Sequence, residues 1–218
     1  MSNLDTRIAQ LAAQYRSLGA EILAETIRIP ADYVDKPLDQ GGDPLCGLSN
    51  HEGPRMEFLR AKLIEIGGVL SPDDVDYDEY GNLVWHLSDP NDPTPPEDKK
   101  IIYLDGHTDT VKALRDQWTA KIGDGIDAYD GQGDGAINWT FLEDELGWLP
   151  PESERDNLLF GRGAADQLSG VITQMIASKI MVELIPEGAL RGAVVRSYAT
   201  TAEEDNDGGG PMYLTRKV

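Results

Sequence analysis

Cysteine, histidine and phenylalanine are all scarce in this sequence, with one, three and three copies among 218 residues. The lone cysteine, Cys46, cannot form a disulfide within the chain, so nothing points to an oxidising compartment. No base lies beside Cys46 to activate a thiol nucleophile, and a small buried or loop residue is the simpler interpretation. Imidazole chemistry is limited to His51, His86 and His107.

Positive charge is scarce too, because 39 Asp and Glu outnumber 19 Lys and Arg and give a formal net charge of −20. Such an acidic surface repels nucleic-acid phosphates and anionic membranes, so neither is an expected partner. We find no apolar run with signal-peptide character and expect none long enough to span a bilayer. The expected location is therefore the cytoplasm.

Hydrophobic periodicity predicts helices and strands that alternate along the chain. The expected helices cover Leu4–Ile27, a segment from Pro54 to the Gly67-Gly68 stop, and Asp166–Leu184. The expected strands cover Asn82–Leu87, Lys100–Asp105 and Arg191–Thr200. This order predicts an α/β fold with a mostly parallel sheet and flanking helices.

The segment from about 112 to 157 is rich in Gly and Asp and has weak periodicity. We expect a long irregular excursion from the core there, with a short helix near Phe141–Leu146. Three tryptophans in it, Trp118, Trp139 and Trp148, could line a substrate cleft, but the preferred interpretation is that they anchor the segment to the core. No internal repeat or domain boundary is apparent, so residues 1–218 are expected to form a single domain.

Chemically informative residues follow two of the expected strands. His107 comes just after one strand, Glu203 and Glu204 come just after another, and Asp166 opens the helix between them. Functional sites in open parallel α/β sheets form outside the carboxyl ends of the strands. These residues are therefore expected to meet at one edge of the sheet.

The pair His107 and Asp109 suits a metal centre, because a zinc-binding imidazole needs an acceptor for its second ring nitrogen. Adjacent carboxylates such as Glu203 and Glu204 can divide the work, one binding the cation and the other taking a proton from water. Simpler interpretations stay open at this point. They are a surface histidine beside a turn, a helix cap at Asp166 and a solvated acidic loop.

Three motifs occur in order: Tyr-Leu-Asp-Gly-His107-Thr-Asp109, Phe-Gly-Arg-Gly-Ala-Ala-Asp166 and Ala-Thr-Thr-Ala-Glu203-Glu204. Together they resemble the M20 family of zinc metallopeptidases and deacylases. The resemblance implies a di-zinc exopeptidase-like catalytic domain in which His107 and Asp166 bind one zinc ion. Asp166 would bridge to a second ion bound by Glu204, while Asp109 orients His107 and Glu203 serves as general acid/base. Co²⁺ or Mn²⁺ would accept similar ligands.

The implied reaction is hydrolysis of an amide or peptide C–N bond by a metal-activated water. The implied substrate is a dipeptide or an N-acyl or N-carbamoyl amino acid. Gln167-Leu-Ser-Gly170 replaces the Met-Lys-Gly-Gly of many family members, which indicates a subgroup.

The family also has a carboxylate ligand further downstream, a lid domain, and a histidine near its C-terminus. This sequence reaches Val218 without them, so we expect the N-terminal part of a catalytic domain, truncated before the lid. A homodimer or a complementing C-terminal polypeptide is the expected source of the remaining ligands. The alternative is a non-catalytic fragment with weak or no metal binding that acts as an association module.

Four aspartates between residues 124 and 134 invite comparison with a calcium loop: Asp124, Asp127, Asp130 and Asp134. Their spacing does not match the alternate positions and closing Glu of an EF-hand. A flexible acidic loop is the preferred interpretation.

Overall fold

The structure is a computed structural model that describes residues 3–31, 39, 52–122, 126–131, 137–204 and 208–217. Cys46, His51, Asp124 and Asp134 lie outside the described residues, so the interpretations given for Cys46 and for these two aspartates stay predictions. In chain order the elements are α1 (Asn3–Ile27), α2 (Gly53–Glu65), β1 (Val75–Tyr77), β2 (Leu83–Ser88), β3 (Lys100–His107), α3 (Arg115–Ile122), α4 (Trp139–Leu146), α5 (Glu152–Arg155), α6 (Ser169–Leu184), β4 (Ala193–Thr200) and α7 (Gly209–Lys217).

The strands form one mixed sheet in the order β1-β2-β4-β3. β3 and β4 are parallel, with His107 opposite Thr200, while β2 is antiparallel to both β4 and β1. The α/β class predicted from the sequence is confirmed, but the sheet is mixed rather than mostly parallel. The connection between the parallel strands β3 and β4 contains α6, because parallel neighbours need a long crossover, which is usually a helix.

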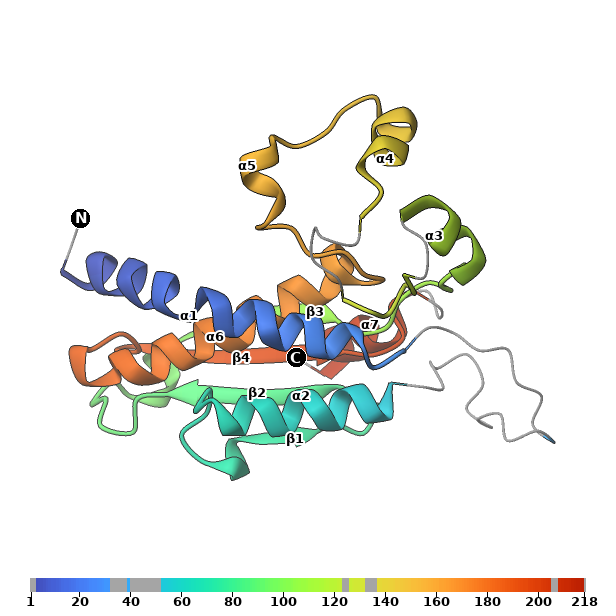
Figure 1. Ribbon diagram of the computed structural model, residues 1–218. Helices are drawn as coiled ribbons and strands as arrows, with labels where there is room; N and C mark the ends of the chain where they lie inside the picture. The colour runs from blue at the N-terminus through green and yellow to red at the C-terminus, as the bar shows by residue number, and fades with distance from the viewer. Residues whose placement is uncertain are drawn as a thin grey trace.

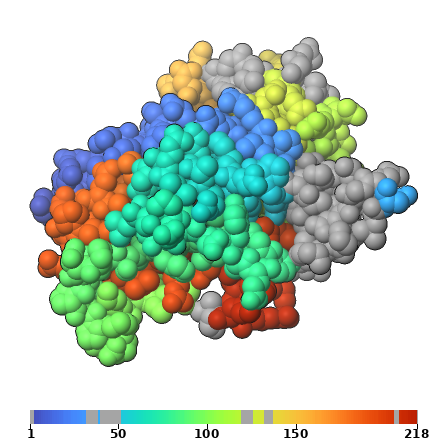
Figure 2. Space-filling model, turned by 90° about the horizontal axis from the view of Figure 1, so that it is seen from below, coloured from blue at the N-terminus to red at the C-terminus, as the bar shows by residue number. Residues whose placement is uncertain are grey.

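Helices α1, α2 and α6 cover one face of this sheet (Figure 1). The space-filling view shows α1 and α2 side by side across the molecule (Figure 2). Trp85 of β2 is fully buried under them and donates its indole N–H to Ser178 Oγ of α6 at 2.9 Å. The main core combines side chains of these three helices with alternate residues of the strands: Ile22, Met56, Leu59, Leu63, Val75, Leu83, Trp85, Leu87, Val171, Ile172, Met175, Val195 and Ala199.

The predicted helices and strands are all present, with ends that differ by a few residues. Pro54 lies in the first turn of α2, and Gly67 ends that helix with a φ of 72°. The predicted third helix is divided, because Ala164–Leu168 forms an irregular π-helical turn before α6 begins at Ser169. Strand β1 and helices α3, α5 and α7 were not predicted, since these short or glycine-rich segments have little periodicity.

The predicted excursion holds α3, α4 and α5, which stand away from the sheet and its covering helices (Figure 1). Trp139 packs edge-on against Phe160, with ring centroids 5.7 Å apart, and Trp118 packs in small clusters of the same region. Trp148, by contrast, is 64% exposed, so the expectation that it anchors the segment is wrong.

β3 is one of the two edge strands of the sheet, and three of its large apolar side chains are exposed. Ile101, Ile102 and Tyr103 have exposed fractions of 47%, 45% and 42%. Since alternate strand residues point to opposite faces, both faces of the strand are open at this edge. We call these three residues the β3 edge surface.

The segment Ala164–Glu187 is long and apolar enough to cross a membrane by length and composition alone. By length and hydropathy, the expectation that no segment could span a bilayer was therefore wrong. The same helix packs against α1 and the sheet in the core, and core helices commonly pass this test.

Asp92 joins the turn after β2 to the start of β4. Its carboxylate accepts hydrogen bonds from the Gly192 N–H at 2.9 Å and from Thr94, and pairs with Lys99 at 3.2 Å. Burial alone would raise the pKa of Asp92, but these bonds outweigh it and hold the pKa well below its usual value.

We predict that Asp92→Asn lowers the free energy of unfolding near neutral pH. A carboxyl whose pKa is depressed by folding stabilises the native state above its unfolded pKa of about 4, and this contribution is lost as the pH falls further. Urea denaturation at about pH 7 and about pH 3 should therefore show the gap between wild type and variant narrowing in acid. Asp98→Asn, at an exposed carboxylate of the same connection, is the control and should change little.

Candidate metal centre

The predicted site residues meet at one edge of the sheet. His107 ends β3, Glu203 and Glu204 follow β4, and Asp166 lies in the irregular turn before α6. Because β3 and β4 are parallel and in register at His107 and Thr200, their carboxyl ends open onto the same edge.

The His107 ring is buried and held from both sides. Its Nδ1 lies 3.0 Å from the backbone oxygen of Asp109 and 3.4 Å from a carboxylate oxygen of that residue. Its Nε2 lies 2.9 Å from Asp166 and 3.8 Å from Glu203. Burial alone would lower the pKa of His107, but the hydrogen bonds to Asp109 and Asp166 outweigh it and raise the pKa to about 9.

Asp109 is fully buried and connects the loop after β3 with the loop after β4. Its two carboxylate oxygens accept hydrogen bonds from the backbone N–H groups of Glu203 and Glu204, at 3.0 and 2.9 Å. Burial would raise the pKa of Asp109, but the bonds from His107 and from these two N–H groups hold it below its usual value. Asp109 therefore orients the His107 ring and fixes the main chain of the paired glutamates.

Asp166 does not cap a helix. The N-cap of α6 is Leu168, and the exposed Asp166 side chain points to His107 Nε2 instead. The simpler interpretation of Asp166 as a helix cap is therefore wrong, and its carboxylate belongs to the site.

Three side chains of the site could together hold one metal ion. His107, Glu203 and Glu204 each offer a ligand atom within 4.8 Å of the others. The Asp166 carboxylate lies close to His107 Nε2, the ring nitrogen that Glu203 also approaches. Burial, followed by the repulsion of neighbouring carboxylates, raises the pKa of Glu204 despite the opposing charge of His107. One imidazole among crowded carboxylates is a donor set that fits Zn²⁺.

The fold is similar to that of several solved structures. Human carnosine dipeptidase 1 matches with a TM-score of 0.58 at 16% identity, over 100% of this chain and 38% of that protein. The dipeptidase Dug1p of Saccharomyces cerevisiae matches with a TM-score of 0.52 at 14% identity, over 91% and 35%. An M20 family metallo-carboxypeptidase of Sulfolobus solfataricus matches with a TM-score of 0.50 at 11% identity, over 83% and 30%. The fold is that of the M20 metallopeptidases.

Sequence similarity to known proteins covers a shorter part of the chain than the structural similarity does. A probable succinyl-diaminopimelate desuccinylase of Staphylococcus epidermidis is 36% identical over 75 residues, which are 34% of this chain and 16% of that protein. No protein-family model matches the chain. The resemblance to the M20 family predicted from the motifs is confirmed, and the chain spans well under half the length of these relatives.

Three residues that support this M20-like site were not predicted as part of it. The buried Arg55 of α2 donates to the carbonyl oxygens of Thr108 and, at 2.9 Å, of Ile29. Gln167 accepts the His107 backbone N–H at 3.1 Å. Glu52 accepts the N–H of Ala202, which has a φ of 50°, at 3.0 Å.

Only Gln167 had a usable signal in the sequence, namely its place beside Asp166. Arg55 and Glu52 reach the site because α2 packs across the sheet, and their local sequence gives no sign of it. Asp127 and Asp130 accept hydrogen bonds from main-chain N–H groups of their own turn. These contacts are compatible with an acidic loop that is not an EF-hand. His86 is exposed on the sheet face away from the core helices and takes no part in the site.

We predict that Asp109→Ala lowers the free energy of unfolding of the metal-free protein by about 1–3 kcal/mol. The change leaves the N–H groups of Glu203 and Glu204 without their acceptor and frees the His107 ring. Urea denaturation in the presence of a chelator measures the effect. Asp166→Ala is the control, because it removes the other carboxylate at His107 but no backbone acceptor. An equal or larger loss in the control would contradict the role given to Asp109.

Proposed function

We propose that this chain carries the metal-dependent catalytic part of an M20-like hydrolase that cleaves an amide or peptide C–N bond. The convergence of His107, Glu203 and Glu204 in front of the buried Asp109 is the observation that carries the proposal. The names of the relatives, two dipeptidases, a carboxypeptidase and a desuccinylase, support this reaction class. The substrate we propose is a dipeptide or an N-acyl or N-carbamoyl amino acid.

His107, Asp166 and Glu204 would hold the metal in this proposal, as two zinc ions or, in their place, Co²⁺ or Mn²⁺. The bound cation supplies a Lewis acid for the carbonyl and the attacking water. Asp109 keeps Nδ1 of His107 occupied, which would leave Nε2 as the nitrogen that binds the metal.

Glu203 is proposed as the general acid/base. Its side chain is 42% exposed, so substrate and water can reach it, and its main chain is fixed by Asp109. It would take a proton from the attacking water as the new C–O bond forms. The same proton then passes to the nitrogen as the C–N bond breaks, so that a carboxylic acid and an amine are released.

Each cation still needs ligands beyond those that converge here, since catalytic zinc usually has three from protein. We propose that a complementing C-terminal polypeptide supplies them, packing against the β3 edge surface. The exposed Ile101, Ile102 and Tyr103 support such a contact. The net charge of −20 disfavours a second copy of this chain in that place, because the two copies repel each other. We propose a cytoplasmic location, supported by the single cysteine.

The alternative function is a non-catalytic association module with weak or no metal binding. The same β3 edge surface favours it, because an open edge strand with apolar side chains is a ready site for pairing. Zinc affinity separates the two functions. Tight binding of zinc to the purified chain, titrated against a competing chelator, supports the hydrolase, and absent binding supports the module.

We predict that His107→Ala lowers zinc affinity by about tenfold or more, because it removes the imidazole ligand proposed for the centre. Glu203→Gln should leave zinc content nearly unchanged and lower turnover of acyl-amino acids by about 10²-fold or more, since it removes the group that transfers the proton. Unchanged zinc affinity in the first variant would exclude His107 as a ligand. Loss of zinc in the second would make Glu203 a ligand rather than the general base.

A further inference from the structure

The Asp166 carboxylate is exposed and depends on other residues for its position. Its side chain is 77% exposed, and in the described part of the chain its only hydrogen bond is to His107 Nε2. That nitrogen is the one proposed to bind the metal, so a bound metal would replace this bond. The position of the carboxylate must then be set by the main chain that carries it.

The next residue, Gln167, ties this main chain to β3. Asp166 (φ −119°, ψ 100°) and Gln167 (φ −129°, ψ 25°) both depart from helical geometry, and the Gln167 side chain reaches the end of β3. Its Oε1 accepts the His107 backbone N–H at 3.1 Å. The following N–H, of Thr108, bonds to Thr200 at 2.8 Å, so the His107 N–H points away from β4 and needs another acceptor. One hydrogen bond therefore joins the segments that present His107 and Asp166.

Two glycines leave the space that the Gln167 side chain occupies. A Cβ on Gly106 would lie 2.9 Å from Gln167 Oε1, and one on Gly170 would lie 3.2 Å from Gln167 Cγ. Neither glycine has a positive φ, so close approach of the glutamine is the physical reason for a glycine at both positions. Gln167 is thus enclosed between β3 and the start of α6.

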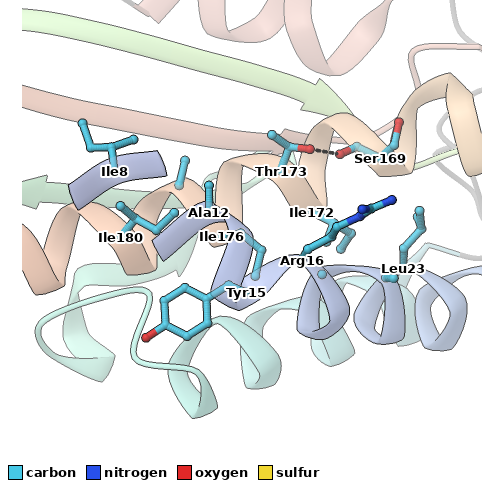
Figure 3. Close-up of a pocket in the computed structure, with 13 residues that line it drawn as sticks. Ile8, Ala12, Tyr15, Arg16, Leu23, Ser169, Ile172, Thr173, Ile176 and Ile180 are labelled. Carbon is cyan, nitrogen blue, oxygen red and sulfur yellow. Dashed lines mark hydrogen bonds between the residues drawn. The ribbon is translucent and has the colours of Figure 1, made fainter. Parts of the chain in front are cut away.

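The first turn of α6 holds the other side of this connection. The Thr173 hydroxyl donates to the Ser169 carbonyl at 2.7 Å (Figure 3), and the Ser169 hydroxyl donates to the Ala165 carbonyl at 3.2 Å. Ser169 and Thr173 also line a groove of about 520 Å³, whose described lining residues belong to α1 and α6 and include none of the metal centre. The turn that carries Gln167 is therefore fixed at α6, and its side chain is fixed at β3.

The acceptor at this position is a particular feature of this chain. Gln167 stands where many M20 members have methionine. A methionine thioether is only a weak acceptor, whereas the amide oxygen of glutamine is a full one. The bond to the His107 N–H is therefore an addition to the residues that the family resemblance implies.

We propose that Gln167 is a positioning residue that holds Asp166 beside His107 and thereby raises the affinity of the centre for its metal. The inference rests on the proposed function for the identity of His107 and Asp166 as ligands. Gln167 itself would not touch the metal, because its amide oxygen is taken by the His107 N–H. Residues that orient ligands in this way commonly change metal affinity by roughly 10–100-fold.

The test is a zinc titration of Gln167→Met against a competing chelator. Methionine has a similar length and removes the amide acceptor, so zinc affinity should fall by about tenfold or more. Gln167→Glu returns an acceptor to the same place and should recover most of the affinity. Gln174→Met is the matched control, because Gln174 Nε2 would lie 3.0 Å from the same Cβ on Gly106 without accepting the His107 N–H. It should leave zinc affinity close to that of wild type.

A measurement on the metal-free chain reports the bond itself. Amide hydrogen exchange in the presence of a chelator follows the His107 N–H, which Gln167 protects. Gln167→Met should raise its exchange rate several-fold, and Gln167→Glu should keep it slow. The urea midpoint of both variants should stay near that of wild type, because the bond is local.

Gly170→Ala tests the same position from the side of α6. The three nearest atoms to its new Cβ all belong to Gln167, so the change should displace this side chain and weaken zinc binding several-fold. The same change in a Gln167→Ala background should have no further effect, because the displaced atoms are already missing. Equal effects in the two backgrounds would contradict the proposal.

The proposal and the proposed function fail in different ways. Unchanged zinc affinity in Gln167→Met would overturn the proposal, and so would an equal loss in Gln174→Met, because packing rather than the acceptor would then be responsible. If wild type binds no zinc, the proposed function fails. The exchange rate of the His107 N–H then still decides whether Gln167 joins the two segments, and equal rates in wild type and Gln167→Met would show that it does not.

Discussion

The site depends on one buried carboxylate that joins two distant loops. Asp109 follows β3 and accepts the backbone N–H groups of Glu203 and Glu204, which follow β4 and lie 94 and 95 residues further along the chain. An ionised acceptor forms stronger hydrogen bonds than a neutral one, and burial protects these bonds from competing water. Because the same carboxylate lies beside His107 Nδ1, the imidazole and the paired glutamates are positioned by a single residue.

The surrounding fold makes this contact possible. Parallel pairing of β3 and β4 brings the ends of both strands to the same edge, and α2 adds Arg55 and Glu52 beneath the loops. Gln167 ties the turn before α6 to the His107 main chain. His107 and the paired glutamates are therefore held in fixed positions, an arrangement that favours metal binding.

The β3 edge surface is an open strand edge with exposed apolar side chains, where we propose that another polypeptide packs. The chain spans 38% of the length of carnosine dipeptidase 1. Ile101, Ile102 and Tyr103 lie in the first half of β3, whereas the site forms at the His107 end of the same strand.

The sequence by itself determined the α/β class, the main helices and strands, and the set of residues that meet at the sheet edge. These follow from local periodicity and from motifs placed after strands, which are properties of neighbouring residues. Only the tertiary structure decided the mixed sheet, the contact of Asp109 with the Glu203 and Glu204 main chain, and the roles of Arg55 and Glu52. These depend on which distant segments pack together, and the packing energy is shared among many residues that no short motif contains.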